Sequence, residues 1–434
     1  MTSTASTSIV VTPSASAQSS RPDTPQSTPP TVAVSDKASD EGSRFKIFFG
    51  LIRKFTQFVD RPDAFVAIGQ SDHELGRMLE VIRFWLTKDL KYIKGKPIKP
   101  YNSVLGEFFR CNWEVEEEQP PITLQNGALT QPPTASSTKG ETEKPITVSY
   151  ITEQTSHHPP ISAYYIHCPE RGLHARGYDQ INVKFSAGSL RVVPGNYNTG
   201  IHVSIDKHEE DYQLTHPTAY LGGVMKGSLY IYVNDSCVIT CPKTGLKAIL
   251  TYDNAWTTGQ NRVSGVIYNY GGVSDKYKRA KEVPDNQVLV RLDGVWQEQI
   301  YYWFPSGDGK VNRNWPPADK HLLIDLTPLM PVPKILPPLE EQLPNESRRF
   351  WKDLTAAIQE KRYADANRVK QGIEQRQRDK EADRNNRNAV WKPRFFSEVT
   401  DDSGQPHLSD EGKELLASMQ KMEFTLEESE ELGA

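Results

Sequence analysis

The sequence predicts an α+β fold, with a large antiparallel sheet between amino-terminal helices and a long carboxy-terminal helical region. Two observations support this prediction. Residues 146–304 contain repeated short runs of Val, Ile, Thr and Tyr separated by turn signals, which is typical of hairpin-linked strands. Residues 346–388 carry apolar side chains at helical spacing in a highly charged background.

The first 42 of the 434 residues are dominated by Ser, Thr, Pro, Ala and Gln. Such a composition buries too little apolar surface to offset the entropy lost on ordering, so we expect a disordered tail at 1–42. This tail has neither the basic start nor the apolar run of a signal peptide. No stretch of the sequence approaches about 18 consecutive apolar residues, so we expect no transmembrane helix.

Residues 45–52 and 75–85 each show the apolar spacing of an amphipathic helix, and Ser71 or Asp72 is expected to cap the second one. Residues 119–144 are rich in Pro, Thr and Gly, and we expect a mobile loop insertion there. The expected strands include residues 146–152, 161–167, 181–185, 228–233, 248–252, 262–270 and 287–292.

The helical region at 346–388 has a thin apolar stripe, which we expect to pack against the sheet while the polar face stays in water. Residues 399–434 contain several glutamates near their end, and we expect an acidic, weakly ordered tail. The stripe consists of Phe350, Trp351, Leu354, Ile358, Tyr363, Ala366, Val369 and Ile373.

Composition also restricts the class of protein. The net charge of -4 argues against a general nucleic-acid binder, and we expect no nucleic-acid partner. Only four cysteines occur, which favours a reducing compartment over a disulfide framework. Cys237 and Cys241 lie four apart, but no second Cys or His pair accompanies them, so we expect no metal site.

The most informative motif is EQTSHHPP at residues 153–160. On a regular strand His157 and His158 would point to opposite faces, which does not suit chelation of one metal ion. At the end of a strand, next to proline, both imidazoles can turn toward a common anion, and they take up protons readily beside a phosphate. Two structural histidines with satisfied hydrogen bonds are the alternative.

Two further motifs carry charged groups. In KPYNSVLGE (residues 99–107), Lys99 is a compact cation and Asn102 offers both a donor and an acceptor. Lys370, Glu374 and Arg378 follow one another at four-residue spacing on one helical face. The alternative for the KPYNSVLGE segment is an ordinary turn with a solvated lysine. The alternative for the helical residues is a solvated ladder of ion pairs.

We expect no enzyme and no cofactor. Gly222 and Gly223 with Lys226 do not have the spacing of a phosphate-binding P-loop. No cysteine is followed six positions later by an arginine, as a cysteine phosphatase requires. Ser156 lies beside His157, but sequence neighbours rarely form a catalytic pair, and no complete set of nucleophile, base and orienting group is evident.

The three motifs, in this order, resemble those of the oxysterol-binding-protein-related family of lipid transfer proteins. The resemblance implies a large incomplete antiparallel β-barrel that encloses a lipid tunnel, formed by residues 43–398. It also implies a phosphoinositide headgroup site at the tunnel mouth. The site residues carried over from the family motifs are Lys99, Asn102, His157, His158, Lys370, Glu374 and Arg378.

The resemblance implies that phosphatidylinositol 4-phosphate is exchanged for a second lipid between membranes. Residues 60–63, 78–85 and 99–110 are most similar to the short branch of the family, without a pleckstrin-homology domain, that is associated with phosphatidylserine. A sterol exchanger and a non-transporting phosphoinositide sensor or tether are the alternatives. We expect a cytoplasmic monomer that contacts membranes transiently, at junctions of the endoplasmic reticulum and plasma membrane.

One departure from the family pattern concerns the lid over the tunnel. Residues 50–55 run almost directly into residues 58–61, where family members normally have a longer apolar, proline-bearing segment. Two interpretations remain: residues 45–55 serve as a shortened lid, or this chain transfers lipid poorly.

Overall fold

The computed structural model describes residues 59–88, 90, 101–116, 119–125, 128–130, 145–186, 189–222, 230–254, 261–271, 275–305 and 320–428. All of them belong to the compact unit Phe45–Ala434. The predicted tail at 1–42, the amphipathic stretch at 45–52 and the shortened lid lie outside the described residues.

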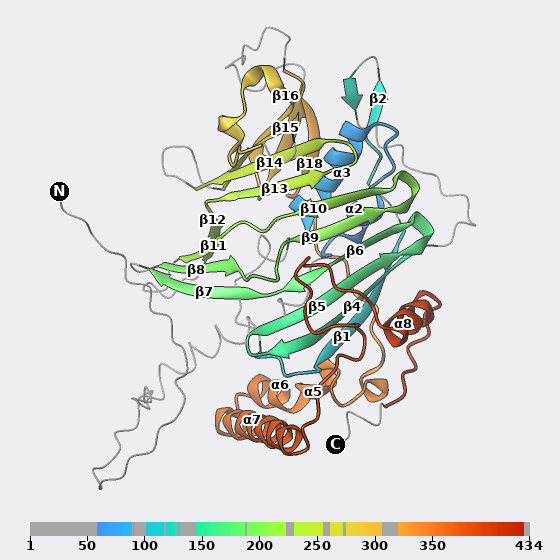
Figure 1. Ribbon diagram of the computed structural model, residues 1–434, viewed down its shortest axis with the longest axis vertical. Coiled ribbons are helices and arrows are strands. Elements are labelled where there is room, and N and C mark those ends of the chain that lie inside the picture. The colour runs from blue at the N-terminus through green and yellow to red at the C-terminus, as the bar shows by residue number, and fades with distance from the viewer. Residues whose placement is uncertain are drawn as a thin grey trace, which may run out of the picture. The chain divides into compact units, whose positions relative to one another are not determined.

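The main element is a twelve-stranded sheet in which every pairing is antiparallel (Figure 1). Its order starts at β1 and ends at β18, and no pairing in the described part of the chain joins these two strands, so the barrel is incomplete. In spatial order the strands are β1 (Phe108–Val115), β4 (Ile146–His157), β5 (Pro160–Cys168), β6 (Leu173–Asp179), β9 (Ile201–Ile205), β10 (Glu210–Leu214), β13 (Ser236–Cys241), β14 (Leu246–Asp253), β15 (Arg262–Asn269), β16 (Val288–Val295), β17 (Gln299–Trp303) and β18 (His321–Asp325).

Two helices lie against the two edge strands of this sheet. α2 (Pro62–Val66) contacts β1, and α3 (Glu74–Thr87) contacts β18. Their apolar side chains share the largest buried cluster with residues from both edges, such as Trp113 and Leu323. The outer side of β1 is also covered, because Asn112 exchanges two backbone hydrogen bonds with Ile335 (2.9 and 2.8 Å).

The α+β prediction is confirmed, and each predicted strand run overlaps an observed strand. A second sheet has the order β12-β11-β8-β7, and a separate hairpin joins β2 to β3. Their bounds are β2 (Thr123–Gln125), β3 (Ala128–Thr130), β7 (Ile181–Ser186), β8 (Ser189–Pro194), β11 (Ala219–Gly222) and β12 (Tyr230–Val233).

Two local predictions need correction. His73 caps α3 in place of Ser71 or Asp72, since its ring Nδ1 accepts the Leu75 amide at 3.1 Å. The described part of the 119–144 insertion is a hairpin anchored in the core, because Ile122 and Leu129 are buried there. Their apolar side chains are the signal that the Pro- and Gly-rich composition concealed.

The carboxy-terminal helical region is divided into three helices, α5 (Ser347–Phe350), α6 (Lys352–Gln359) and α7 (Tyr363–Asn386). Lys361 adopts a left-handed conformation (φ 58°) between α6 and α7, which turns the chain. Five of the eight residues of the apolar stripe are buried, and they pack on Tyr101 and Val104, the segment that leads into β1.

The prediction of a weakly ordered tail at 399–434 is wrong for residues 410–420. Residues 410–420 form helix α8 (Asp410–Gln420), whose apolar face is buried with Phe108 and Ile151 of the sheet. Asn112 of β1 donates a hydrogen bond to the Met419 carbonyl at 2.5 Å. The buried face consists of Leu415, Leu416 and Met419. Helical spacing of these apolar residues outweighs the acidic composition.

None of the helices in the described part of the chain is both long and apolar enough to cross a bilayer.

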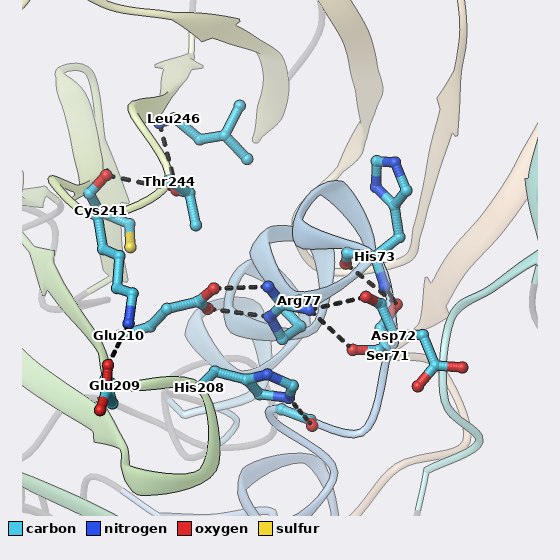
Figure 2. A network of polar contacts seen from close by, with 12 residues as sticks. Ser71, Asp72, His73, Arg77, His208, Glu209, Glu210, Cys241, Thr244 and Leu246 are labelled. Carbon is cyan, nitrogen blue, oxygen red and sulfur yellow. Dashed lines mark hydrogen bonds and ion pairs between the residues drawn. The ribbon is translucent and has the colours of Figure 1, made fainter.

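A buried ion pair fixes α3 on the sheet (Figure 2). Arg77 donates to both carboxylate oxygens of Glu210 on β10, at 2.9 and 2.5 Å, and to the backbone carbonyls of Ser71 and Asp72. Glu210 accepts a further hydrogen bond from the Tyr212 hydroxyl at 2.8 Å. The arrangement leaves neither charge without a partner.

We predict that Arg77→Met lowers the free energy of unfolding by about 3–5 kcal/mol, because it leaves the Glu210 carboxylate buried without its cation. Urea denaturation measures this change. Lys243→Met is the control: it removes the neighbouring ion pair with Glu209, which is exposed, and should leave stability unchanged. Equal stability of Arg77→Met and the wild type would contradict the prediction.

Candidate functional site

The first two motifs lie side by side. Phe108 pairs with Glu153 in the β1–β4 register, so the segment before β1 continues along the end of β4. The Gly106 amide donates to the Gln154 carbonyl at 2.9 Å, and the Gln154 amide donates to the Glu107 carbonyl at 2.8 Å. These bonds place residues 101–107 next to the EQTSHHPP turn.

A β-bulge directs His157. Gln154 pairs with Ser162 and Ser156 pairs with Ile161, so Thr155 is an extra residue in β4. Residues three apart on a regular strand point to opposite faces, but the bulge brings Gln154 and His157 to the same side. The Gln154 side-chain nitrogen then lies 3.0 Å from His157 Nδ1. In the neutral ring Nδ1 accepts this bond and Nε2 carries the proton.

His158 lies outside the strand, in the turn that connects β4 to β5, and its bond to Pro159 is cis. Strand alternation does not apply to it, so its ring can lie beside that of His157. The two ring centroids are 4.6 Å apart at an interplanar angle of 63°. His158 is exposed and His157 is half-buried.

Groups from three segments of the chain act on the pKa of His157. Burial, followed by the neighbouring charge of His158, lowers the pKa of the His157 imidazole below its ordinary value. A hydrogen bond with the Ser103 backbone and the carboxylate of Glu381 on α7 act on this pKa in the opposite direction. His157 therefore interacts with the segment after Lys99 and with the third motif's helix.

α7 is held over residues 101–104 by its apolar stripe. Ala366 and Ile373 are buried in one cluster with Val104 and with Trp351, whose ring stacks on Tyr101 at 4.4 Å between centroids. Ile373 precedes Glu374 in the chain, so packing of the stripe also fixes the position of the predicted charged residues.

The charged residues of α7 are exposed and contact one another or their helix neighbours. Lys370 Nζ lies 3.0 Å from Glu374 Oε1, and Arg378 donates to the Gln375 side-chain oxygen at 3.2 and 2.6 Å. Within the described residues, no hydrogen bond or ion pair joins these residues to the two histidines. Nor does any group of three or more His, Cys, Asp or Glu in that part of the chain suit a metal ion.

Of the seven predicted residues, His157 and His158 lie side by side, and Asn102 is an exposed residue next to Ser103, whose backbone is hydrogen-bonded to His157. Lys370, Glu374 and Arg378 lie on the helix packed against the same segment. Lys99 lies outside the described residues. Gln154 was not predicted as a site residue, because its contact with His157 depends on the bulge at Thr155, which no sequence pattern marks.

The sequence profile described as "Oxysterol-binding protein" matches residues 49–415. The chain belongs to the oxysterol-binding protein family. Its description as a family of binding proteins confirms the prediction that the chain is not an enzyme.

Among its relatives is "Oxysterol-binding protein-like protein 1" of Schizosaccharomyces pombe, with 35% identity over 445 aligned positions, 84% of this chain and 83% of that protein. Human "Oxysterol-binding protein-related protein 11" is 28% identical over 354 positions, 80% of this chain but 44% of that protein. The chain therefore spans less than half the length of this human relative.

Solved structures support the fold. The Osh1 ORD domain in complex with cholesterol has a TM-score of 0.59 at 19% identity and covers 88% of this chain and 84% of that one. The Osh3 ORD of Saccharomyces cerevisiae in complex with PI(4)P has a TM-score of 0.55 at 16% identity and covers 85% and 84%. At these identities the similarity concerns the fold alone.

We predict that His157 of the wild-type protein is mainly the Nε2-protonated tautomer at neutral pH, and that Gln154→Ala increases the fraction of the Nδ1-protonated tautomer. The substitution removes the Gln154 amide that donates to His157 Nδ1, so this nitrogen is no longer held in its unprotonated form. Nitrogen shifts of the ten histidines in selectively ¹⁵N-labelled protein report this change. His158 serves as the control within the same spectra, since Gln154 does not bond to it. An unchanged His157 tautomer in the variant would contradict the prediction.

Proposed function

We propose that this protein binds phosphatidylinositol 4-phosphate and exchanges it for phosphatidylserine between two membranes. The observation that carries the proposal is the arrangement of three segments: residues 101–107 are hydrogen-bonded to Gln154 of the EQTSHHPP motif, and α7 packs on Val104 of the same segment. Lys99, Lys370 and Arg378 would provide permanent cations, and the two imidazoles would provide titratable ones. Such a set of cationic groups suits a phosphate monoester, whose charge is about −2.

The apolar part of the lipid would lie inside the incomplete barrel. Each methylene removed from water contributes about 0.8 kcal/mol, so two acyl chains give a large driving force for enclosure. One interior can hold one lipid at a time, so loading of the phosphoinositide excludes the other cargo. A phosphoinositide gradient between membranes then drives transport of the second lipid.

The resemblance of residues 60–63, 78–85 and 99–110 to the short branch supports phosphatidylserine as the second lipid. A sterol is the second candidate, because relatives of known structure include the Osh1 ORD domain with cholesterol and with ergosterol. Exchange requires two membranes, and we place the protein as a peripheral monomer at contacts between the endoplasmic reticulum and the plasma membrane.

The second lipid can be identified directly. Mass spectrometry of lipids that copurify with the full chain should detect phosphatidylserine and phosphatidylinositol 4-phosphate. Ergosterol or cholesterol in place of phosphatidylserine would overturn the choice of cargo. Phosphoinositide binding without stimulated movement of the second lipid between liposomes would indicate a sensor or tether.

We predict that the double variant His157→Ala and His158→Ala binds phosphatidylinositol 4-phosphate at least ~100-fold more weakly. Hydrogen bonds between charged groups contribute about 1.5–3 kcal/mol each, and two are lost. Extraction of a fluorescent analogue from liposomes measures the change. His174→Ala on β6, at the strand end remote from the turn, is the control and should bind as the wild type does. Unchanged uptake by the double variant would refute the role of the histidines.

Phosphoinositide affinity should increase as the pH falls from 8 to 6.5. The pKa of His157 lies below its ordinary value in the free protein, and a bound phosphate raises it, so binding is coupled to proton uptake. Titrations at several pH values would show the slope. The double histidine variant should lack it, and an equal slope in both proteins would contradict this assignment.

A further inference from the structure

Two buried carboxylates, one in each of the first two motifs, lie beside the expected headgroup site. We propose that Glu107 and Glu153 are positioning residues for that site, because Glu107 holds the beginning of the α5–α7 arm (residues 347–386) against the motifs and Glu153 holds the segment that follows its end. The inference rests on the proposed function and extends it to residues that do not contact the headgroup.

Glu107 holds the beginning of the arm. One of its carboxylate oxygens accepts from the Ser347 hydroxyl at 2.7 Å and from the Trp351 indole at 2.9 Å. The other accepts from the Val104 amide of its own segment at 3.1 Å. A single side chain thus connects the Asn102 segment to α5 and to the start of α6.

Glu153 holds the segment that follows the arm. Its two oxygens accept the amides of Arg394 and Phe395, both at 2.8 Å. Phe395 is itself buried against Phe108 of β1, with 4.9 Å between ring centroids. The chain after α7 is therefore attached to β4 only four residues before His157.

Both carboxylates are almost fully buried, at 6% exposure for Glu107 and 2% for Glu153. Burial raises the pKa of Glu153 to about 7 and also raises that of Glu107. Donors on both oxygens offset part of this unfavourable desolvation. An amide could not replace either group without loss, because its NH2 would face another donor.

The arm depends on these two attachments because its last helix buries few side chains of its own. Only Ala366 and Ile373 are buried among the 24 residues of α7. The helix carries Lys370, Glu374 and Arg378 on its exposed surface, so a shift at either end would change their distance from His157.

The test compares Glu107→Gln and Glu153→Gln with Glu80→Gln. Glu80 on α3 is a matched control, because it is fully buried, has a pKa raised to about 7 by burial, and accepts the amides of Gly69, Ser71 and Ile122. It lies outside the arm and both motifs. For each full-length variant, binding of fluorescent phosphatidylinositol 4-phosphate and of fluorescent phosphatidylserine is measured. The affinity for the phosphoinositide divided by the affinity for phosphatidylserine is then compared with the same ratio for the wild type.

We expect the ratio to fall about tenfold in both arm variants, with a larger loss for the phosphoinositide, and to stay constant in Glu80→Gln. Amide hydrogen exchange across residues 370–378 should become faster in the arm variants only. If Glu153→Gln does not fold, Glu153→Asp keeps the charge and should give a smaller fall in the ratio.

An unchanged ratio in either arm variant, or an equal fall in Glu80→Gln, would overturn the assignment of positioning residues while leaving the proposed function intact. If the wild-type protein does not bind the phosphoinositide at all, the proposed function itself fails, and the assignment fails with it.

Discussion

The pairing of β1 with β4 is the interaction on which the rest of the site depends. It aligns Phe108 with Glu153, and this register places the residues before β1 next to the turn after β4. A slip of one residue would turn every side chain of β1 to the opposite face and move Asn112 away from its partner Met419 in α8. Buried side chains on both strands, such as Trp113 and Tyr150, make such a slip unfavourable.

The sequence was a good guide to the elements that repeat. Alternation identified the strands, and helical spacing identified α3 and the stripe of the arm, because burial on one face leaves a periodic trace. Features that depend on contacts between distant parts of the chain left no periodic pattern in the sequence. The bulge at Thr155 depends on how β4 meets β5, and the exchange of hydrogen bonds between Asn112 and Ile335 joins residues far apart in the chain.

Composition was a poorer guide than spacing. It concealed α8 in an acidic segment and the β2–β3 hairpin in a Pro-rich one, since a few apolar residues at the right positions are enough to anchor either. The candidate site shows the same limit. Its charged residues were found from motifs, whereas Glu107 and Glu153 act through backbone and indole donors that no sequence pattern identifies.

The ion pair of Lys370 with Glu374 is exposed, with 58% and 48% of the side chains accessible. Exposed pairs contribute little to stability, so its partners can be exchanged at low energetic cost. The buried contacts of the arm behave differently, because their disruption leaves unsatisfied groups away from water. The helix thus combines a fixed base with charged groups that are free to change partners.

The packing of α8 has a consequence for shorter versions of the chain. Leu415, Leu416 and Met419 cover Phe108 and Ile151, at the strands that carry both motifs. A chain that stopped before Asp410, through a premature stop codon or proteolysis, would keep every motif residue but would expose an apolar patch to solvent. Such a patch promotes self-association, so truncation there removes the protein through aggregation and cellular quality control rather than through loss of any ligand contact.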